Sequence, residues 1–324
     1  MILNYQNPVW AGYLADPFVL KWRGEYYAYG TGSSSGASLY DDGRMFPVLH
    51  SRDMAHWQCL GGALEPLTTL SAQNYWAPEV VEKDGTFYMY FSADGIEGRN
   101  HQLRVAVADH PAGPFRDSGR VLMPQEDFSI DAHPFRDPKD GQWYLFFAKD
   151  FLDERVGTGT AVVPLADDML SVTDKPRTVL RAAHDWHIHA RQHSNYSGSW
   201  DAWHTVEGAF VVLHDDLYYC FYSGGAWMTP GYGVSYGVAE QVMGPYRDEW
   251  SSEGPGVLKG VEGKVIGPGH NSIVLGPDDK TEFVVYHAWD IEKTARRMCI
   301  DPLIWTPNGP RCAGPSWTEQ SIIL

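Results

Sequence analysis

Short apolar runs separated by turn residues dominate this 324-residue chain. Residues 18–22 (FVLKW), 87–91 (FYMYF), 103–107 (LRVAV), 218–222 (YYCFY) and 283–286 (FVVY) are rich in aromatic and β-branched side chains. Turn-forming residues flank these runs, and such runs predict β-strands. We find no amphipathic segment that predicts a helix longer than two turns. The pattern therefore predicts an all-β protein.

One phrase recurs five times: a polar residue begins an apolar strand, a turn follows, and a second strand rich in aromatics closes the unit. The copies begin at Ala15, Ala77, Ile130, Val206 and Gly269, and their leading residues are Asp16, Glu79, Asp131, Glu207 and His270. The leading residues are 63, 52, 76 and 63 positions apart (16 to 79, 79 to 131, 131 to 207, 207 to 270). Such a period is typical of propeller blades. We therefore predict that residues 1–324 form a single five-bladed β-propeller domain. Its blades have about four antiparallel strands each and bring the leading residues together around a central axis.

Composition and charge narrow the classes of partner. The formal net charge of −16 disfavours nucleic acid, anionic membranes and polyanionic substrates, whose recognition needs Lys and Arg. A neutral oligosaccharide remains compatible, because sugar rings stack on aromatic side chains, which make up 14% of the residues. The four cysteines are scattered without metal-binding spacing. No signal peptide is visible, which predicts a cytoplasmic protein, or a secreted one if a leader has been removed.

Three carboxylates lead repeats one, three and four: Asp16, Asp131 and Glu207. If each begins the strand that lines the channel of a radial fold, the three acids converge. Converging carboxylates repel one another, and at least one pKa should rise, as a general acid at neutral pH requires. Glycoside hydrolysis uses such a set. The alternative is that each acid merely caps a turn.

These residues resemble glycoside hydrolase family 43. The resemblance rests on ADPF, WAPEV, IDxxxF, VEGAF, GxGHNS and a closing YHAWD…RRMCIDPLIW, and it runs from about residue 7 to about residue 310. It implies a five-bladed propeller that acts on arabinan, arabinoxylan or xylan oligosaccharides with inversion. By this resemblance Asp16 is the general base, Glu207 the general acid, and Asp131 the third acid that tunes the pKa of Glu207. The base and acid of an inverting enzyme are expected about 6.5–9.5 Å apart.

The resemblance also implies roles for residues outside the acid set. Trp76 matches a tryptophan beside the bound sugar, and Arg296, or else Arg297, matches an arginine that reaches substrate hydroxyls. No cofactor is required for the chemistry. His270 matches an axial histidine that could hold a structural Ca²⁺, largely through waters. A lone histidine is a poor calcium ligand, so a hydrogen-bonded core histidine is the alternative. Glu79 is expected to be a wall or structural residue.

Aromatic residues close to the general acid are candidates for the leaving-group subsite. Trp200, Trp203 and His204 precede Glu207, and Trp227 follows the aromatic strand of repeat four. The alternative for the first three is packing under the polar, His-rich insertion at residues 181–193. Because long insertions are often functional, this one could also cover the mouth of the pocket.

Departures from the family pattern and the absence of a C-terminal β-sandwich shape the functional prediction. The usual closing Asp-Gly-Trp-Pro is Asn308-Gly-Pro-Arg here, and Glu-Gly-Pro has become Glu207-Gly-Ala. Because many β-xylosidases of the family carry such a sandwich, its absence favours an arabinofuranosidase or arabinanase-type activity. With the inversion that the resemblance implies, the prediction is an inverting enzyme that releases α-L-arabinofuranosyl units. A β-xylosidase or an endo-arabinanase is the alternative. The sequence leaves open the sugar, the linkage, exo or endo cleavage, and a homo-oligomer formed through exposed blade rims.

Two more distant alternatives are a retaining fructan hydrolase and a non-catalytic carbohydrate-binding propeller. The first uses Asn-Asp-Pro-Asn and Glu-Cys phrases, which the chain lacks. The second has no positive support, since all three acids are present.

Overall fold

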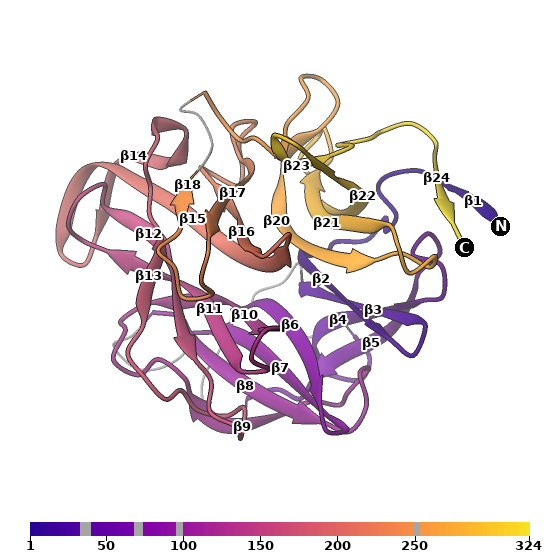
Figure 1. Ribbon diagram of the computed structural model, residues 1–324, viewed down its shortest axis with the longest axis horizontal. Helices are drawn as coiled ribbons and strands as arrows, with labels where there is room; N and C mark the ends of the chain where they lie inside the picture. Colours follow the sequence, from indigo (N-terminus) through magenta and orange to yellow (C-terminus); the bar gives the residue numbers. More distant parts are fainter. Residues whose placement is uncertain (33–39, 68–73, 95–99, 249–252) are drawn as a thin grey trace.

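Five blades of mainly antiparallel strands surround a central axis in the computed structural model, which describes residues 1–32, 40–67, 74–94, 100–248 and 253–324 (Figure 1). The first blade holds β2 (Ala15–Trp22), β3 (Glu25–Thr31), β4 (Met45–Ser51) and β5 (Gln58–Leu64). The second holds β6 (Tyr75–Lys83), β7 (Thr86–Ala93), β8 (Gln102–Ala108) and β9 (Arg116–Val121). The third holds β10 (Ser129–Arg136), β11 (Trp143–Phe151), β12 (Gly157–Pro164) and β13 (Arg177–Leu180).

The fourth blade holds β15 (Gly198–His214), β16 (Leu217–Gly224) and β17 (Gly233–Ala239), with the short β18 (Arg247–Asp248) and β19 (Leu258–Lys259). The fifth holds β20 (Ile266–Leu275), β21 (Glu282–Trp289), β22 (Arg296–Thr306) and β23 (Gly309–Cys312). The first strand of each blade contacts the first strand of the next, and β20 contacts β2, so the ring closes. The predicted five-bladed propeller is confirmed.

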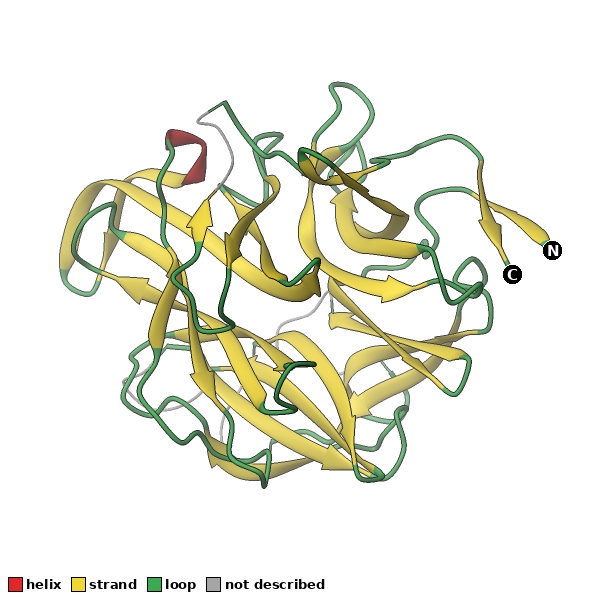
Figure 2. Ribbon diagram, in the orientation of Figure 1, coloured by secondary structure: helices red, strands yellow, loops and turns green. Residues whose placement is uncertain are grey.

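Elements outside the blades are few. β1 (Ile2–Tyr5) pairs with β24 (Gln320–Ile323), which places the two ends of the chain side by side (Figure 1). The one helix of the described residues is the 3₁₀ turn η1 (Asp185–His187), and no helix there is long and apolar enough to cross a membrane (Figure 2).

Blades three and four are joined more tightly than the rest. β12 pairs in parallel with β15, with Gly157 opposite His204, and a Cβ at Gly157 would meet the His204 carbonyl oxygen at 2.0 Å. β14 (Ile188–Asn195) then pairs with the start of β15 as a long hairpin. The His-rich insertion therefore folds as η1 followed by an outer strand.

Aromatic side chains of the first and second strands fill the space between blades. Trp22 of the first blade meets Phe87 of the second edge to face, with ring centroids 5.4 Å apart. Phe135 and Tyr218 make the same kind of contact between blades three and four, at 6.3 Å. Edge-to-face packing of large rings buries much apolar area and fixes the mutual angle of two sheets. The aromatic surplus therefore serves mainly the core.

A β-bulge interrupts the first strand of every blade at the same place. The first residue of each bulge has a positive φ: 51° at Asp16, 45° at Ala77, 56° at Asp131, 59° at Gly208 and 50° at His270. A bulge leaves one backbone N–H outside the ladder and redirects the adjacent side chains. In this fold it aims them at the axis.

Each of these free N–H groups donates to a side chain of the preceding blade. The bonds run from Asp16 to Nδ1 of His287 (3.0 Å), Ala77 to Oγ1 of Thr31 (2.9 Å), Asp131 to Oγ of Ser92 (3.2 Å), Gly208 to Oδ2 of Asp131 (3.1 Å) and His270 to Oγ of Ser223 (2.7 Å). Four acceptors occupy one position of the second strand. At that position the third blade has Ala148, whose side chain has no acceptor group. The carboxylate of Asp131 accepts the N–H of Gly208 instead.

The structure corrects the alignment of the repeats. Glu207 precedes its bulge residue by one position, and Glu79 follows Ala77 by two. The carboxylate of Glu79 is buried, with Oε2 2.7 Å from Nδ1 of His133. Glu79 is therefore a structural residue that links blades two and three, and it does not line the axial cavity.

Candidate active site

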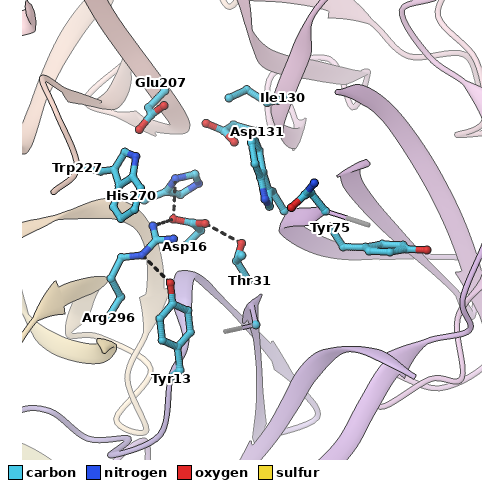
Figure 3. A pocket seen from close by; sticks show the side chains of 13 residues that line it. Tyr13, Asp16, Thr31, Tyr75, Ile130, Asp131, Glu207, Trp227, His270 and Arg296 are labelled. Carbon is cyan, nitrogen blue, oxygen red and sulfur yellow. Dashed lines mark hydrogen bonds and ion pairs between the residues drawn. The ribbon is translucent and has the colours of Figure 1, made fainter. Parts of the chain in front are cut away.

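The bulges surround a cavity of about 330 Å³ at the axis (Figure 3). Residues from all five blades and from the segments between them line it: Tyr13, Asp16, Thr31, Gly32, Asn74, Tyr75, Trp76, Ile130, Asp131, Glu207, Trp227, His270 and Arg296. The three predicted acids are thus brought together in one cavity, although 115 positions separate Asp16 from Asp131 and 76 separate Asp131 from Glu207.

Asp16 lies among hydrogen-bond donors and a cation. Its Oδ1 is 3.1 Å from the guanidinium of Arg296 and 3.4 Å from Nδ1 of His270, and its Oδ2 accepts the hydroxyl of Thr31 at 2.7 Å. Burial alone would raise the pKa of Asp16. Arg296, followed by His270, outweighs burial and holds the pKa well below its usual range. Asp16 is therefore ionised at neutral pH.

Glu207 lies in the opposite environment. Burial, and then the charge of Asp131, raise the pKa of Glu207 to about 8. Its Oε1 accepts a hydrogen bond from the hydroxyl of Tyr232 at 2.8 Å, which opposes the shift without cancelling it. A carboxyl group with such a pKa carries a proton at neutral pH.

Asp131 shares the buried region with Glu207. Burial, and then the negative charge of Asp16, raise the pKa of Asp131, while the N–H of Gly208 favours its ionised form. Gly208 is the residue after Glu207, so this bond holds the Asp131 carboxylate beside the backbone of the acid. After burial, the charge of Asp131 is the largest electrostatic cause of the raised pKa of Glu207, so the ionisation of the two acids is coupled.

Arg296 faces the cavity, and Arg297 does not. The guanidinium of Arg296 lies 4.5 Å from the ring of Trp227 and donates to the hydroxyl of Tyr13 at 3.2 Å. Trp289 stacks behind Trp227 at 5.7 Å and donates to its carbonyl oxygen at 2.9 Å. Arg297 instead pairs with Asp290 at 3.1 Å. The sequence did not decide which of the two arginines faces the cavity, and in the structure it is Arg296.

Trp76 and Trp227 line the cavity, as predicted for sugar-binding aromatics. Trp76 stacks on His101 with centroids 3.5 Å apart and an interplanar angle of 16°. Burial lowers the pKa of His101 to about 4, so the ring under Trp76 is neutral. This support fixes the plane of Trp76 at the wall of the cavity.

Trp203 and His204 lie outside the cavity lining. Trp203 is buried against Trp200 and His193 in the β14–β15 hairpin, at centroid distances of 5.3 and 4.9 Å. The backbone N–H of His204 donates to the carbonyl of Val156 at 2.9 Å where blades three and four join. Trp203 and His204 thus pack within the protein, which was the alternative to a place in the leaving-group subsite.

His270 reaches the axis, but its surroundings do not match a calcium site. Its Nδ1 faces the Asp16 carboxylate, whose other oxygen is bonded to Thr31. Calcium needs six to eight oxygen ligands, and the described part of the chain holds no group of three or more His, Cys, Asp or Glu residues that could bind a metal.

The sequence did not identify four residues that bond to the predicted site residues: Tyr13, Thr31, Tyr232 and His287. Thr31 and His287 had a signal, because they share their repeat position with Ser92 and Ser223 at the ends of the aromatic strands. Tyr13 and Tyr232 lie outside the repeat, and only the folded chain shows their contacts.

A propeller with a cavity that is lined by three carboxyl groups, one of them ionised and one protonated, has the machinery of a glycoside hydrolase. The model of the glycosyl hydrolases family 43 matches residues 5–310, and the chain belongs to this family. Enzymes of the family need no cofactor for catalysis.

Relatives and solved structures agree with this assignment. The β-D-galactofuranosidase XynD of Aspergillus niger is 27% identical, over 94% of this chain and 83% of its own. The extracellular exo-α-(1→5)-L-arabinofuranosidase ArbA of Cellvibrio japonicus is 24% identical, over 91% of this chain and 84% of its own. The crystal structure of a thermostable family-43 glycoside hydrolase is 30% identical, covers 98% of both chains and superposes with a TM-score of 0.83.

Proposed function

We propose that this protein is an inverting glycosidase that releases single α-L-arabinofuranosyl units from the non-reducing ends of neutral plant-cell-wall oligosaccharides. The observation that carries the proposal is the opposite protonation of two acids in one cavity, Asp16 ionised and Glu207 protonated. Inversion in one step needs such a pair. The furanosyl specificity is supported by two relatives that match over nine-tenths of the chain and are named for furanosides.

The reaction follows from the two protonation states. Asp16 accepts a proton from a water molecule whose oxygen attacks the anomeric carbon. The bond from that carbon to the leaving oxygen breaks, and its electron pair goes to the leaving oxygen. Glu207 donates its proton to that oxygen, so the products are a sugar of inverted configuration and the shortened alcohol. Asp131 tunes Glu207 through its charge, and Arg296 and Trp76 hold the sugar.

The Arg296 side of the cavity supports cleavage at chain ends. Arg296 is held between Asp16, Tyr13 and Trp227, and Trp289 packs behind Trp227. An ordered stack at one wall stops a sugar chain from continuing there. No step of this mechanism uses calcium.

A panel of aryl glycosides tests the substrate. We expect hydrolysis of 4-nitrophenyl α-L-arabinofuranoside at a kcat/KM at least tenfold above that of the β-D-xylopyranoside and β-D-galactofuranoside, with arabinose as the first product from linear arabino-oligosaccharides. A higher rate on the galactofuranoside or xyloside would replace arabinose as the substrate. Release of oligosaccharides from the chain interior would show endo cleavage.

Proton NMR of the first product tests the stereochemistry. Initial appearance of the inverted anomer supports the direct displacement. Initial appearance of the retained anomer would contradict it and would favour a covalent intermediate, as in fructan hydrolases. If the protein binds these sugars and hydrolyses none of them, the non-catalytic propeller is the better description.

A further inference from the structure

A buried tyrosine outside the cavity lining holds one oxygen of Glu207. Tyr232 precedes β17 and is fully buried, and its hydroxyl donates to Oε1 of Glu207 at 2.8 Å. The same loop carries Trp227 into the cavity wall. Because Oε1 is engaged from the protein side, Oε2 is the oxygen that remains for the substrate.

The position of Tyr232 is fixed on several sides. Its ring stacks on His287 with centroids 6.0 Å apart and an interplanar angle of 8°. A Cβ at Gly269 would lie 2.3 Å from Cε1 of Tyr232, so only glycine leaves room for the ring. His287 in turn accepts the backbone N–H of Asp16. Tyr232 therefore lies between the acid and the residue that supports the base.

From this geometry we infer that Tyr232 is a positioning residue for the general acid. Its O–H holds Oε1, so that the proton of Glu207 resides on Oε2 and is delivered from there to the leaving oxygen. The inference deepens the proposed function and rests on the assignment of Glu207 as the acid. Burial keeps the phenol protonated, because it raises the pKa of Tyr232 well above the usual value.

The hydrogen bond from Tyr232 opposes the effect of the two neighbouring acids on the pKa of Glu207. Asp131 on β10 and Asp16 on β2 disfavour the charged form of Glu207, while His270 on β20 and the Tyr232 hydroxyl favour it. A donor to a carboxylate stabilises the charged form. The hydroxyl therefore keeps Glu207 acidic enough to release its proton.

The variant Tyr232→Phe removes the hydroxyl and keeps the ring on His287. We expect the alkaline limb of kcat/KM to move up by about one pH unit, because a hydrogen bond to the ionised form is lost. We expect kcat to fall about tenfold on oligosaccharides and alkyl glycosides and to change little on 2,4-dinitrophenyl glycosides, whose leaving group needs no proton. KM should stay near the parent value.

Tyr218→Phe is the matched control. Tyr218 is a buried residue at the other end of β16, and its hydroxyl donates to Oδ2 of Asp137 at 2.8 Å. The substitution Tyr218→Phe removes a tyrosine–carboxylate hydrogen bond from the same blade, as Tyr232→Phe does. We therefore expect lower thermal stability and an unchanged pH profile. An unmoved alkaline limb in Tyr232→Phe, with an equal loss on every leaving group, would overturn the inference.

A fluorinated tyrosine at position 232 gives an independent test that does not depend on the folding of the Phe variant. A difluorotyrosine is a stronger donor, so the alkaline limb should move down, opposite to the Phe variant. A shift upward or none would contradict the inference. If the unmodified protein hydrolyses no glycoside, the proposed function fails and the inference falls with it. If it is active and the limbs do not move, the inference alone fails.

Discussion

The Asp16 side and the Glu207 side of the cavity, which hold the proposed base and the proposed acid, show how one fold gives two carboxyl groups opposite properties. Asp16 and Glu207 are both half-buried in the cavity wall, and this withdrawal from water alone would raise both pKa values. Asp16 has a guanidinium 3.1 Å away, whereas the charged neighbour that most affects Glu207 is another acid, Asp131. The sign of the nearest charge, rather than burial, therefore decides which acid is ionised.

The two sides also differ in how the blades are joined. Where blades five and one meet, the bulge N–H of Asp16 donates to the neutral imidazole of His287, whose pKa burial lowers to about 4. Where blades three and four meet, the bulge N–H of Gly208 donates to the Asp131 carboxylate. The same backbone feature thus uses a neutral acceptor beside the base and an acidic acceptor beside the acid.

The largest expected effect is the loss of kcat when either Asp16 or Glu207 is neutralised. How this loss depends on the leaving group of the substrate should distinguish the two acids. Asp16→Asn should lower kcat by about 10⁴-fold on every substrate, because the attacking water loses its base. Glu207→Gln should lower kcat about 10³-fold on oligosaccharides and far less on 2,4-dinitrophenyl glycosides, whose departure needs no proton. Steady-state kinetics on both substrate types measures the difference. Equal losses across leaving groups in both variants would mean that the roles are not divided in this way.

Removal of the Arg296 guanidinium beside Asp16 should have the second-largest effect on activity. Without the guanidinium, Arg296→Met leaves Asp16 buried with less compensation, so its pKa rises and the acidic limb of kcat/KM moves up by about one pH unit or more. We also expect kcat/KM to fall about 100-fold, since in the proposed mechanism this side chain holds the sugar. Arg297→Met, which removes the neighbouring arginine paired with Asp290, should leave the limb in place. A limb that stays put in Arg296→Met would show that the guanidinium does not set the state of Asp16.

Neutralising the third acid probes the acid side. Asp131→Asn keeps an oxygen for the Gly208 N–H and removes the negative charge that raises the pKa of Glu207. The alkaline limb should therefore move down by about one pH unit, with a loss of about tenfold in kcat at neutral pH. Asp137→Asn, a change to a buried acid bound to Tyr218, serves as the control. An alkaline limb at its original pH would refute the tuning role of Asp131.

The smallest effect concerns stability. The folded-state pKa of Glu207, about 8, lies above its ordinary value near 4.5, so its contribution to the free energy of unfolding is fully present below that ordinary value and is lost as pH rises through the folded pKa. Glu207→Gln cannot ionise and escapes this loss. Its Tm should exceed that of the parent by a few degrees at pH 9, and the two should converge near pH 4. Calorimetry that finds the same difference at both pH values would argue against a raised pKa.

The repeat explains why much of the fold could be predicted. Five apolar–turn–aromatic phrases predicted five blades, and the acids that lead three of them predicted the cavity. The exact alignment of the phrases was not predictable, because Glu79 and Glu207 flank bulges whose position depends on pairing with the second strand. A shift of one residue in a strand turns a side chain from one face to the other.

Residues near the acid in sequence were the least reliable candidates for the site. Trp203 and His204 precede Glu207 by only a few positions, yet the β14–β15 hairpin and the parallel pairing with β12 direct them away from the axis. Tyr232 is more distant in the chain and bonds directly to the acid. Proximity in sequence does not give proximity in a cavity, since an extended strand advances about 3.3 Å per residue and successive side chains point to opposite faces.

The sequence by itself determined the five-fold repeat, the all-β class, the family and the identity of the three acids, because these depend on residue types recurring at set positions. Only the tertiary structure decided the protonation of the acids, since a pKa responds to charges a few ångströms away that are distant along the chain. Arg296 reaches Asp16 across 280 positions, and Asp131 reaches Gly208 across 77. Closure of the ring brings these pairs together, and with them a base and an acid in one cavity.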